Sequence, residues 1–296
     1  MANFKEIRTR IASVASTRQI TSAMKMVAAA KLKKAQDTVV NFRPYALKMQ
    51  EIIMSVASSL EGNYDTAYAD ARDYQKVLIV ALTSNRGLCG AFNSNAIKEA
   101  VQLAERKYGN YPKPVEIHYM PIGKKGYDAL RKRKVHLEKP NTDIIDRPTY
   151  ENAAELAQLL MNEFSTGNYD CIDIVYNEFV NAASQRVKCK QFLPLLPEEQ
   201  SAGKGKKSQQ LDYIFEPTKQ TILLELIPQN LRLTFYQTLL DSVASEFGAR
   251  MTSMHQATDN ATSLMKELTL QYNKARQAAI TNEIVEIVSG AEALKG

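Results

Sequence analysis

The sequence contains no tryptophan and few cysteines or histidines among its 296 residues. The three cysteines (Cys89, Cys171 and Cys189) stand far apart with no CxxC spacing. This usage indicates a reducing compartment and no disulfide framework. The three histidines (His118, His136 and His255) are dispersed in the same way. Because zinc ligands usually show clustered spacing, we expect surface or half-buried histidines and no metal site.

Long hydrophobic runs are also missing, since no stretch of about eighteen apolar residues occurs that could span a membrane. The apolar fraction of 45% is nevertheless ordinary, so the chain can bury a real core. Its length is sufficient for one large domain or two modest ones.

Acidic residues are nearly absent from the first 36 positions. That segment holds eight Lys or Arg and one acid, Glu6, so its net charge is +7, whereas the net charge of the whole chain is +6. The remainder is −1 and close to neutral, so the basic character belongs to one segment. Within it, the stretch STRQITSAMKMVAAAKLKKAQ (16–36) has no acid at all.

Several roles are compatible with a basic segment of this kind. A mitochondrial presequence has a similar composition, but the apolar stripe continues unbroken through residues 39–56, so cleavage would sever a helix. Nucleic-acid-binding regions carry denser arginine, whereas Ala28, Ala29 and Ala30 alternate here with well-spaced lysines. A membrane-surface helix would need Trp, Phe or Leu on its apolar face. A solvated face and a face directed at acidic protein loops remain open.

The two ends of the chain each predict one long helix. The first sixty residues contain only Pro44 and no glycine, and apolar residues recur every three or four positions (Phe4, Ile7, Ile11, Val14, Met24, Val27, Ala28 and Ala35). A helix of about 55 residues would be roughly 80 Å long. After Pro228 a similar stripe runs on (Val243, Phe247, Met251, Met254, Ala261, Leu264, Leu268, Ala275, Ile284 and Ile287). Such long periodicity favours a coiled coil, with a seam rich in Ala and Met.

The middle of the chain alternates strand and helix signals. We expect strands over 76–84, 115–123, 171–180 and 185–195, and helices over 93–109 and 150–164. Asn93 or Ser94 is a plausible cap of the first of these helices. The order predicts an α/β layer with parallel pairing, and residues 200–210 read as a polar loop.

The predicted fold class is therefore α/β, in which a long antiparallel coiled coil of the N- and C-terminal helices accompanies a central Rossmann-like domain. The expected divisions are an N-terminal coiled-coil helix (1–60), a central α/β domain (70–216) and a C-terminal coiled-coil helix (217–296).

The stretch TSNRGLCGAFN (83–93) is the most enzyme-like part of the sequence, because it joins a strand to a helix and contains two glycines. It has neither GxGxxG nor GxxxxGK[ST], and no GxSxG, HExxH or paired carboxylates accompany it. We therefore favour a structural turn. An α/β enzyme that uses Cys89 as a nucleophile stays an alternative.

Three stretches resemble the γ subunit of F-type ATP synthases: KEIRTRIASVASTRQITSAMKMVAAAKLKKAQ, SNRGLCGAFN and YNKARQAAITNEIVEIVSGAEAL. The resemblance covers the whole chain in the right order. It implies a central rotor shaft that couples ion-driven rotation of a membrane c ring to conformational changes at catalytic β subunits. The chain itself would be non-catalytic and bind no cofactor or metal.

The resemblance also implies contact residues. Those facing β subunits would be Met24, Lys25, Lys31, Lys33, Lys34, Arg276, Gln277, Thr281 and Glu283, and those near the c ring would be Tyr213, Phe215 and Glu216. Seam packing is the alternative role for Met24, and core packing for Phe215.

The expected partners are the α and β subunits of the catalytic hexamer, the ε subunit and the c ring, with no nucleic acid and no direct membrane span. Because the chain starts at the matching region with no presequence before it, we expect a bacterial protein, peripheral on the cytoplasmic face of the cell membrane. A nucleic-acid-binding coiled-coil protein is the rival hypothesis.

Overall fold

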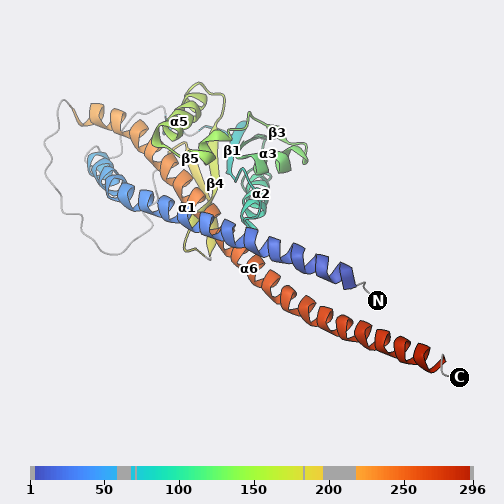
Figure 1. Ribbon diagram of the computed structural model, residues 1–296. Helices are drawn as coiled ribbons and strands as arrows, with labels where there is room; N and C mark the ends of the chain where they lie inside the picture. Colours follow the sequence, from blue (N-terminus) through green and yellow to red (C-terminus); the bar gives the residue numbers. More distant parts are fainter. Residues whose placement is uncertain (1–3, 59–67, 71, 183, 196–217, 294–296) are drawn as a thin grey trace. The chain divides into compact units, whose positions relative to one another are not determined.

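Two helices, α1 (Phe4–Ser58) and α6 (Lys219–Ala293), begin and end the chain in the computed structural model (Figure 1). The structure describes residues 4–58, 68–70, 72–182, 184–195 and 218–293. The chain divides into two units: unit 1 comprises Met1–Ala29 and Arg250–Gly296, and unit 2 comprises Ala30–Ala249. Both helices contribute to both units. The predicted α/β class with long terminal helices is confirmed.

The helical segments of unit 1 pack through a seven-residue repeat. Its buried positions are Ile7, Thr21 and Ala28 in α1 and Met254, Ala261 and Leu268 in α6. Half-buried Val14 fills the gap in the first series. A strict spacing of seven is the signature of a left-handed coiled coil. The seam includes the small residues Ala28 and Ala261, at which the two backbones can approach closely.

Two cross-helix contacts fix the direction of the pair. The hydroxyls of Thr21 and Thr258 lie 2.8 Å apart, and Lys25 Nζ lies 3.3 Å from His255 Nδ1. As the residue number rises along α1 it falls along α6, so the helices are antiparallel.

The same register explains why part of α6 has no counterpart among the described residues of α1. The paired residue numbers add up to 279 and 280, which places Phe4 opposite Ala275. Every described residue from Arg276 to Ala293 is exposed. The expectation that Ile284 and Ile287 belong to the seam was therefore wrong, because α1 begins too late to cover them.

Two further seam assignments were also wrong. Val27 and Leu264 are exposed. Each residue fits the three- and four-residue spacing of the apolar pattern, but neither belongs to the set of positions, seven residues apart, that is buried between the helices. Spacing alone admits more than one stripe on a helix, and only the partner decides which stripe is covered.

Unit 2 contains one five-stranded sheet in the order β3-β2-β1-β4-β5. The strands are β1 (Lys76–Leu82), β2 (Glu116–Ile122), β3 (His136–Leu137), β4 (Cys171–Phe179) and β5 (Gln185–Leu193). The first four are parallel, and β5 pairs with β4 in the antiparallel sense. The central strand β1 is fully buried from Val77 to Leu82, which accounts for its unbroken apolar run.

The prediction of parallel pairing thus fails for the edge strand. Only a short connection separates β4 from β5, and a parallel crossover needs a dozen or more residues. Along most of β5, exposed residues alternate with partly buried ones, as expected for an edge strand with one solvent-exposed face.

The helices of unit 2 are α2 (Phe92–Leu103), the π-helical turn η1 (Ala104–Tyr108), α3 (Lys124–Arg131), α4 (Asp143–Asp146) and α5 (Tyr150–Ser165). The sequence did not predict α3, α4 or β3. Gly126 made α3 a poor helix candidate. The structure needs this glycine, since a Cβ there would lie 2.6 Å from Thr83 Oγ1.

The predicted cap of α2 was also wrong. The capping position is Ala91, which makes no side-chain hydrogen bond to the helix. Asn93 lies inside the first turn, and its amide oxygen accepts a hydrogen bond from the backbone N–H of Ser84 at 2.9 Å. Its side chain therefore ties the helix to the end of β1.

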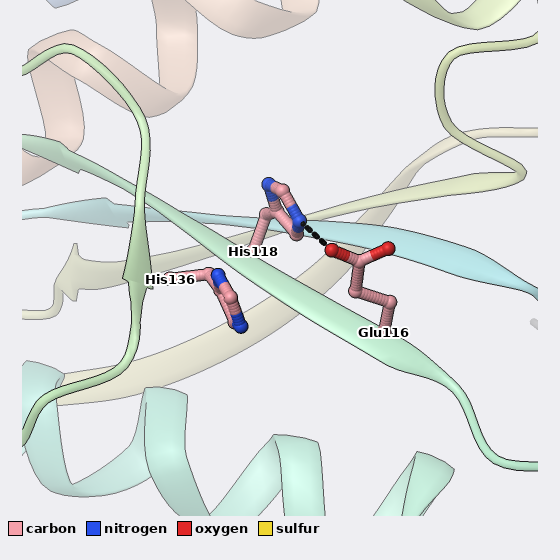
Figure 2. Close-up of side chains that lie close together, drawn as sticks. All are labelled: Glu116, His118 and His136. Atoms are coloured by element: carbon pink, nitrogen blue, oxygen red, sulfur yellow. Dashed lines mark hydrogen bonds and ion pairs between the residues drawn. The ribbon is translucent and has the colours of Figure 1, made fainter.

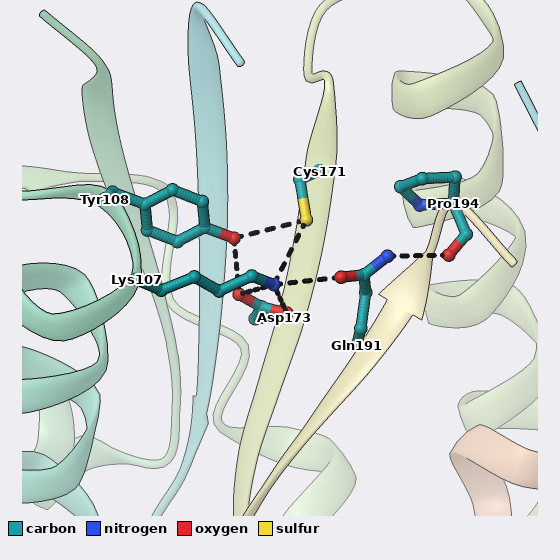
Figure 3. Close-up of polar contacts among 6 residues, drawn as sticks. All are labelled: Lys107, Tyr108, Cys171, Asp173, Gln191 and Pro194. Atoms are coloured by element: carbon teal, nitrogen blue, oxygen red, sulfur yellow. Dashed lines mark hydrogen bonds and ion pairs between the residues drawn. The ribbon is translucent and has the colours of Figure 1, made fainter. Parts of the chain in front are cut away.

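A buried polar cluster joins η1 to the sheet (Figure 3). Lys107 Nζ donates to both oxygens of Asp173 at 2.9 Å and to Gln191 Oε1 at 2.9 Å. The Tyr108 hydroxyl donates to Asp173 Oδ2 at 2.6 Å. The Asp173 side chain is 3% exposed and that of Lys107 is 27% exposed. The carboxylate is thus buried together with a cation and a hydroxyl donor.

The electrostatics of this cluster follow from burial. Burial would lower the pKa of Lys107, but the attraction of Asp173 and Cys171 outweighs it, and the pKa of Lys107 is raised. Burial raises the pKa of the Cys171 thiol to about 11, with a further contribution from Asp173. Cys171 is therefore a neutral thiol at physiological pH, and its sulfur accepts a hydrogen bond from the Tyr108 hydroxyl at 3.2 Å.

We predict that Lys107→Met lowers the free energy of unfolding by about 3 kcal/mol, because it leaves a buried carboxylate without its cation. Urea unfolding of the full chain measures this difference. Lys113→Met is the matched control, since Lys113 pairs with Asp73 at 3.1 Å where both side chains are exposed. It should cost about 0–1 kcal/mol. Equal losses in the two variants would contradict the role assigned to the buried cluster.

Helix α6 also packs on the sheet within unit 2. Ser245 Oγ donates to the backbone carbonyl of Asn177 at 2.9 Å. One turn earlier, half-buried Asp241 faces a mixed electrostatic environment. Burial first, and then Glu178, raise its pKa from 3.8 to about 6, against the opposing effects of Lys188 and Arg43.

A carboxyl group with a raised native pKa binds more protons in the folded state, so stability falls as pH rises from about 4 to 6. We predict that Asp241→Asn increases the free energy of unfolding at pH 7.5 by about 1–2 kcal/mol, allowing for screening at a half-buried site. The gain should shrink as the pH falls toward 4. Urea unfolding at both pH values measures it, and a gain independent of pH would show that ionisation is not the cause.

Candidate functional site

The end of α6 beyond the coiled coil is the most distinctive surface of unit 1. Its large apolar residues are 47–70% exposed (Ile280, Ile284, Val285, Ile287 and Val288). Clustered exposed apolar residues mark interaction sites in soluble proteins. We call residues 276–293 the unpaired end of α6.

Four of the predicted contact residues fall on the unpaired end: Arg276, Gln277, Thr281 and Glu283, all of which are exposed. The sequence analysis did not predict that the exposed apolar residues beside them are contact candidates, and it assigned two of these residues, Ile284 and Ile287, to the coiled-coil seam. The available signal was the length difference between the two predicted helices, since a longer helix must end without a partner.

The predicted contacts in α1 are divided between the units. In unit 1, Met24 and Lys25 are half-buried, and Lys25 lies beside His255. In unit 2, Lys31, Lys33 and Lys34 are exposed, and the ammonium of Lys31 lies 5.3 Å from the centre of the Phe247 ring. This cation–π contact holds the Lys31 side chain against α6 while its ammonium group stays exposed to solvent.

The remaining predicted contacts are Tyr213, Phe215 and Glu216. They lie outside the described residues, so their proposed contact with a ring stays a prediction.

The turn after β1 is closed by its own side chains. Ser84 Oγ donates to the Arg86 carbonyl at 2.6 Å, and Asn93 Nδ2 donates to Ser84 Oγ at 2.8 Å and to Cys89 Sγ at 3.2 Å. Leu88 and Gly90 adopt positive φ angles of 64° and 57°. Cys89 is only 1% exposed, so no substrate can reach its sulfur in this conformation. The geometry supports a structural turn.

Two histidines that are far apart in the sequence lie together in the fold. The rings of His118 and His136 stack with centroids 5.3 Å apart. The carboxylate of Glu116 contacts the His118 ring (Figure 2). These three residues are the one group among the described parts of the chain whose donor atoms could hold a metal ion. The Glu116-x-His118 spacing in a predicted strand was the signal for this arrangement, because alternate residues share a face.

None of the described helices is both long and apolar enough to cross a membrane.

Comparisons with solved structures define the class of protein. The chain is similar to one chain in a structure of the central stalk and c ring of Tetrahymena thermophila mitochondrial ATP synthase, with 25% identity, coverage of 80% of this chain and 99% of that one, and a TM-score of 0.58. It also shares its fold with the rotor of the Euglena gracilis mitochondrial enzyme at 23% identity, over 94% and 98% of the two chains, with a TM-score of 0.63. The fold is that of an ATP synthase central stalk.

Sequence comparisons identify the family. Residues 3–294 match the family model described as ATP synthase. The ATP synthase gamma chains of Flavobacterium johnsoniae and Trichlorobacter lovleyi are 55% and 43% identical, each over 100% of both chains. The chain belongs to the ATP synthase gamma chain family. The rival assignment to nucleic-acid-binding coiled-coil proteins is not supported.

We predict that Cys89→Ala leaves ATP hydrolysis by the assembled complex unchanged within about twofold, because the thiol is buried and its hydrogen bonds stay within the turn. The free energy of unfolding should fall by about 1–2 kcal/mol, since Asn93 loses an acceptor. Cys189→Ala on the edge strand is the control for loss of a half-buried thiol. An ATPase loss specific to the Cys89 variant would revive the catalytic alternative.

Proposed function

We propose that this chain is the central rotor shaft of an F-type ATP synthase. It couples ion-driven rotation of a membrane c ring to conformational changes at the catalytic β subunits, for ATP synthesis or hydrolysis. The observation that carries this proposal is the unpaired end of α6, an exposed helix of mixed apolar and polar character that suits insertion among partner subunits.

The chain acts in this proposal as a coupling element without catalytic chemistry or a cofactor of its own. Two features of the described residues support that role. The strand-to-helix turn buries Cys89 behind its own hydrogen bonds, and the cluster around Asp173 is occupied by internal partners.

The contact residues have properties suited to a sliding surface. Lys33 and Lys34 are exposed, as are Arg276 and Glu283 on the unpaired end. An exposed charge pair contributes about 0–1 kcal/mol, so such contacts can form and break as a shaft turns. Deep complementary pockets would instead hold the shaft in one position. We therefore assign Lys25, Lys31, Lys33 and Lys34 to passing contacts with acidic loops of β, and Arg276 and Glu283 to contacts with the β loops that meet the C-terminal helix.

The proposed partners are the α and β subunits, the ε subunit and the c ring. The Tetrahymena structure, described as central stalk and c ring, supports the c-ring assignment. We assign the chain to the cytoplasmic face of a bacterial membrane, held there through the c ring.

The direct test is the triple variant Lys31→Ala, Lys33→Ala and Lys34→Ala in the assembled complex. We expect weaker ATP-driven ion pumping per ATP hydrolysed, because three cations that face the stator are lost, and reduced assembly. Nucleotide affinity of isolated β subunits should not change. Pumping in membrane vesicles, normalised to ATPase activity, measures the effect.

The matched control replaces the same three lysines by arginine. It keeps the charge and should restore most of the coupling, whereas a loss of helix packing would not be rescued in this way. Normal pumping by the alanine variant would contradict the contact assignment.

A further inference from the structure

The strand register of unit 2 brings three metal-binding side chains to one face of the sheet. β2 and β3 are parallel, and His118 lies directly opposite His136. Glu116 precedes His118 by two residues in the same strand, so its side chain points to the same face. The grouping is therefore a direct product of topology, although the residues form no compact motif in the sequence.

The donor atoms are close to the distances that a metal requires. Glu116 Oε1 lies 2.8 Å from His118 Nε2, and one donor atom of each of the three residues lies within 4.8 Å of the other two (Figure 2). Tetrahedral zinc with bonds of about 2.0–2.1 Å needs donors roughly 3.3 Å apart. Glu116 and His136 are exposed and can close this gap by side-chain rotation.

A supporting hydrogen-bond chain orients the central ligand. His118 Nδ1 lies 2.8 Å from Glu138 Oε1, and the Tyr169 hydroxyl donates to the same oxygen at 2.7 Å. Tyr169 is buried, which holds Glu138 in place. When Nδ1–H donates to Glu138, the lone pair of Nε2 points toward Glu116. A carboxylate behind a ligating histidine is the usual second layer of a zinc site.

The chemistry of the donors selects the class of ion. Two imidazoles and one carboxylate suit zinc and similar divalent transition metals, whereas magnesium and calcium prefer oxygen ligands. Lys76 is a cation beside the cluster; it is opposite Glu116 in the adjacent strand and lies 5.4 Å from the centre of the Tyr169 ring. Two carboxylates, Glu116 and Glu138, offset its charge.

We propose that Glu116, His118 and His136 bind one divalent transition metal of the zinc class, with water in the remaining position. The ion takes the place of the hydrogen bond between Glu116 and His118. It joins β2 to β3, a strand of only two residues that has little backbone pairing of its own. This proposal departs from the expectation, drawn from the sequence, that no metal is bound.

The test is a zinc titration of the full chain in competition with a chromophoric chelator. The wild-type chain should bind one zinc ion per molecule. His136→Asn and Glu116→Gln each remove an exposed ligand and should weaken binding at least about tenfold, and Glu138→Gln should weaken it about 10–100-fold. His255→Asn, which removes the histidine outside the cluster, should leave affinity unchanged.

His136→Asn decides the matter, because its exposed side chain can be changed with the fold intact, as circular dichroism would verify. The same titration with magnesium chloride should show no competition with zinc. Absence of stoichiometric zinc binding, equal affinity in the wild-type and His136→Asn chains, or an equal loss in His255→Asn would overturn the proposal.

Discussion

The antiparallel packing of α1 against α6 is the interaction on which the account depends. Neither terminal helix could bury its apolar stripe alone, and each unit shows the pair in contact. In unit 1 the contact runs through Thr21 and Thr258, and in unit 2 the rings of Phe42 and Tyr236 meet edge to face with centroids 5.1 Å apart. Because α6 is longer than α1 in the direction of its C-terminus, the same pairing that buries one part of α6 leaves the rest exposed.

That exposed remainder links folding to function. A helix end with Ile284 and Ile287 in water is costly for an isolated chain, since each buried apolar side chain would contribute about 1.5–3 kcal/mol. A partner that covers these residues recovers this free energy. The neighbouring charged and polar residues limit how permanent such a contact becomes, which is the property a turning shaft requires.

The α/β part of unit 2 obeys a different constraint. Its sheet is covered closely enough that the Asp173 side chain in β4 is buried, and its carboxylate pairs there with Lys107 and Tyr108. The parallel pairing of β4 with β1 positions Asp173 for that cluster. The parallel pairing of β2 with β3 places His118 opposite His136. The sheet thus creates side-chain groupings that have no counterpart in local sequence.

Much of the fold could be predicted from residue patterns. The scarcity of glycine and proline, together with the long apolar stripes, identified both long helices, and the apolar run from Val77 to Leu82 identified the central strand. The exposure of Val27 and Ile284 could not be predicted in the same way, because helical periodicity does not specify the length or register of the partner. The helix α3 was missed because Gly126 meets a tertiary need at Thr83 that local propensity does not express.

The predicted contact residues came from a resemblance to a family and not from physical signals in the residues themselves. Exposure places Arg276 and Glu283 on a surface able to meet a partner, while only an assembled complex can show the contact. The histidine cluster was missed because linear spacing was used to judge proximity. Parallel strands bring distant residues together through a crossover whose register the sequence does not state.

The most direct test of the central claim is rotation of this chain within an assembled complex. The chain would carry a probe on a cysteine introduced at exposed Lys113, with Cys189→Ala to remove the half-buried thiol, and the catalytic hexamer would be fixed to a surface. Addition of ATP should drive the probe around in one direction. ATP hydrolysis with the probe stationary would contradict the assignment of this chain as the rotor.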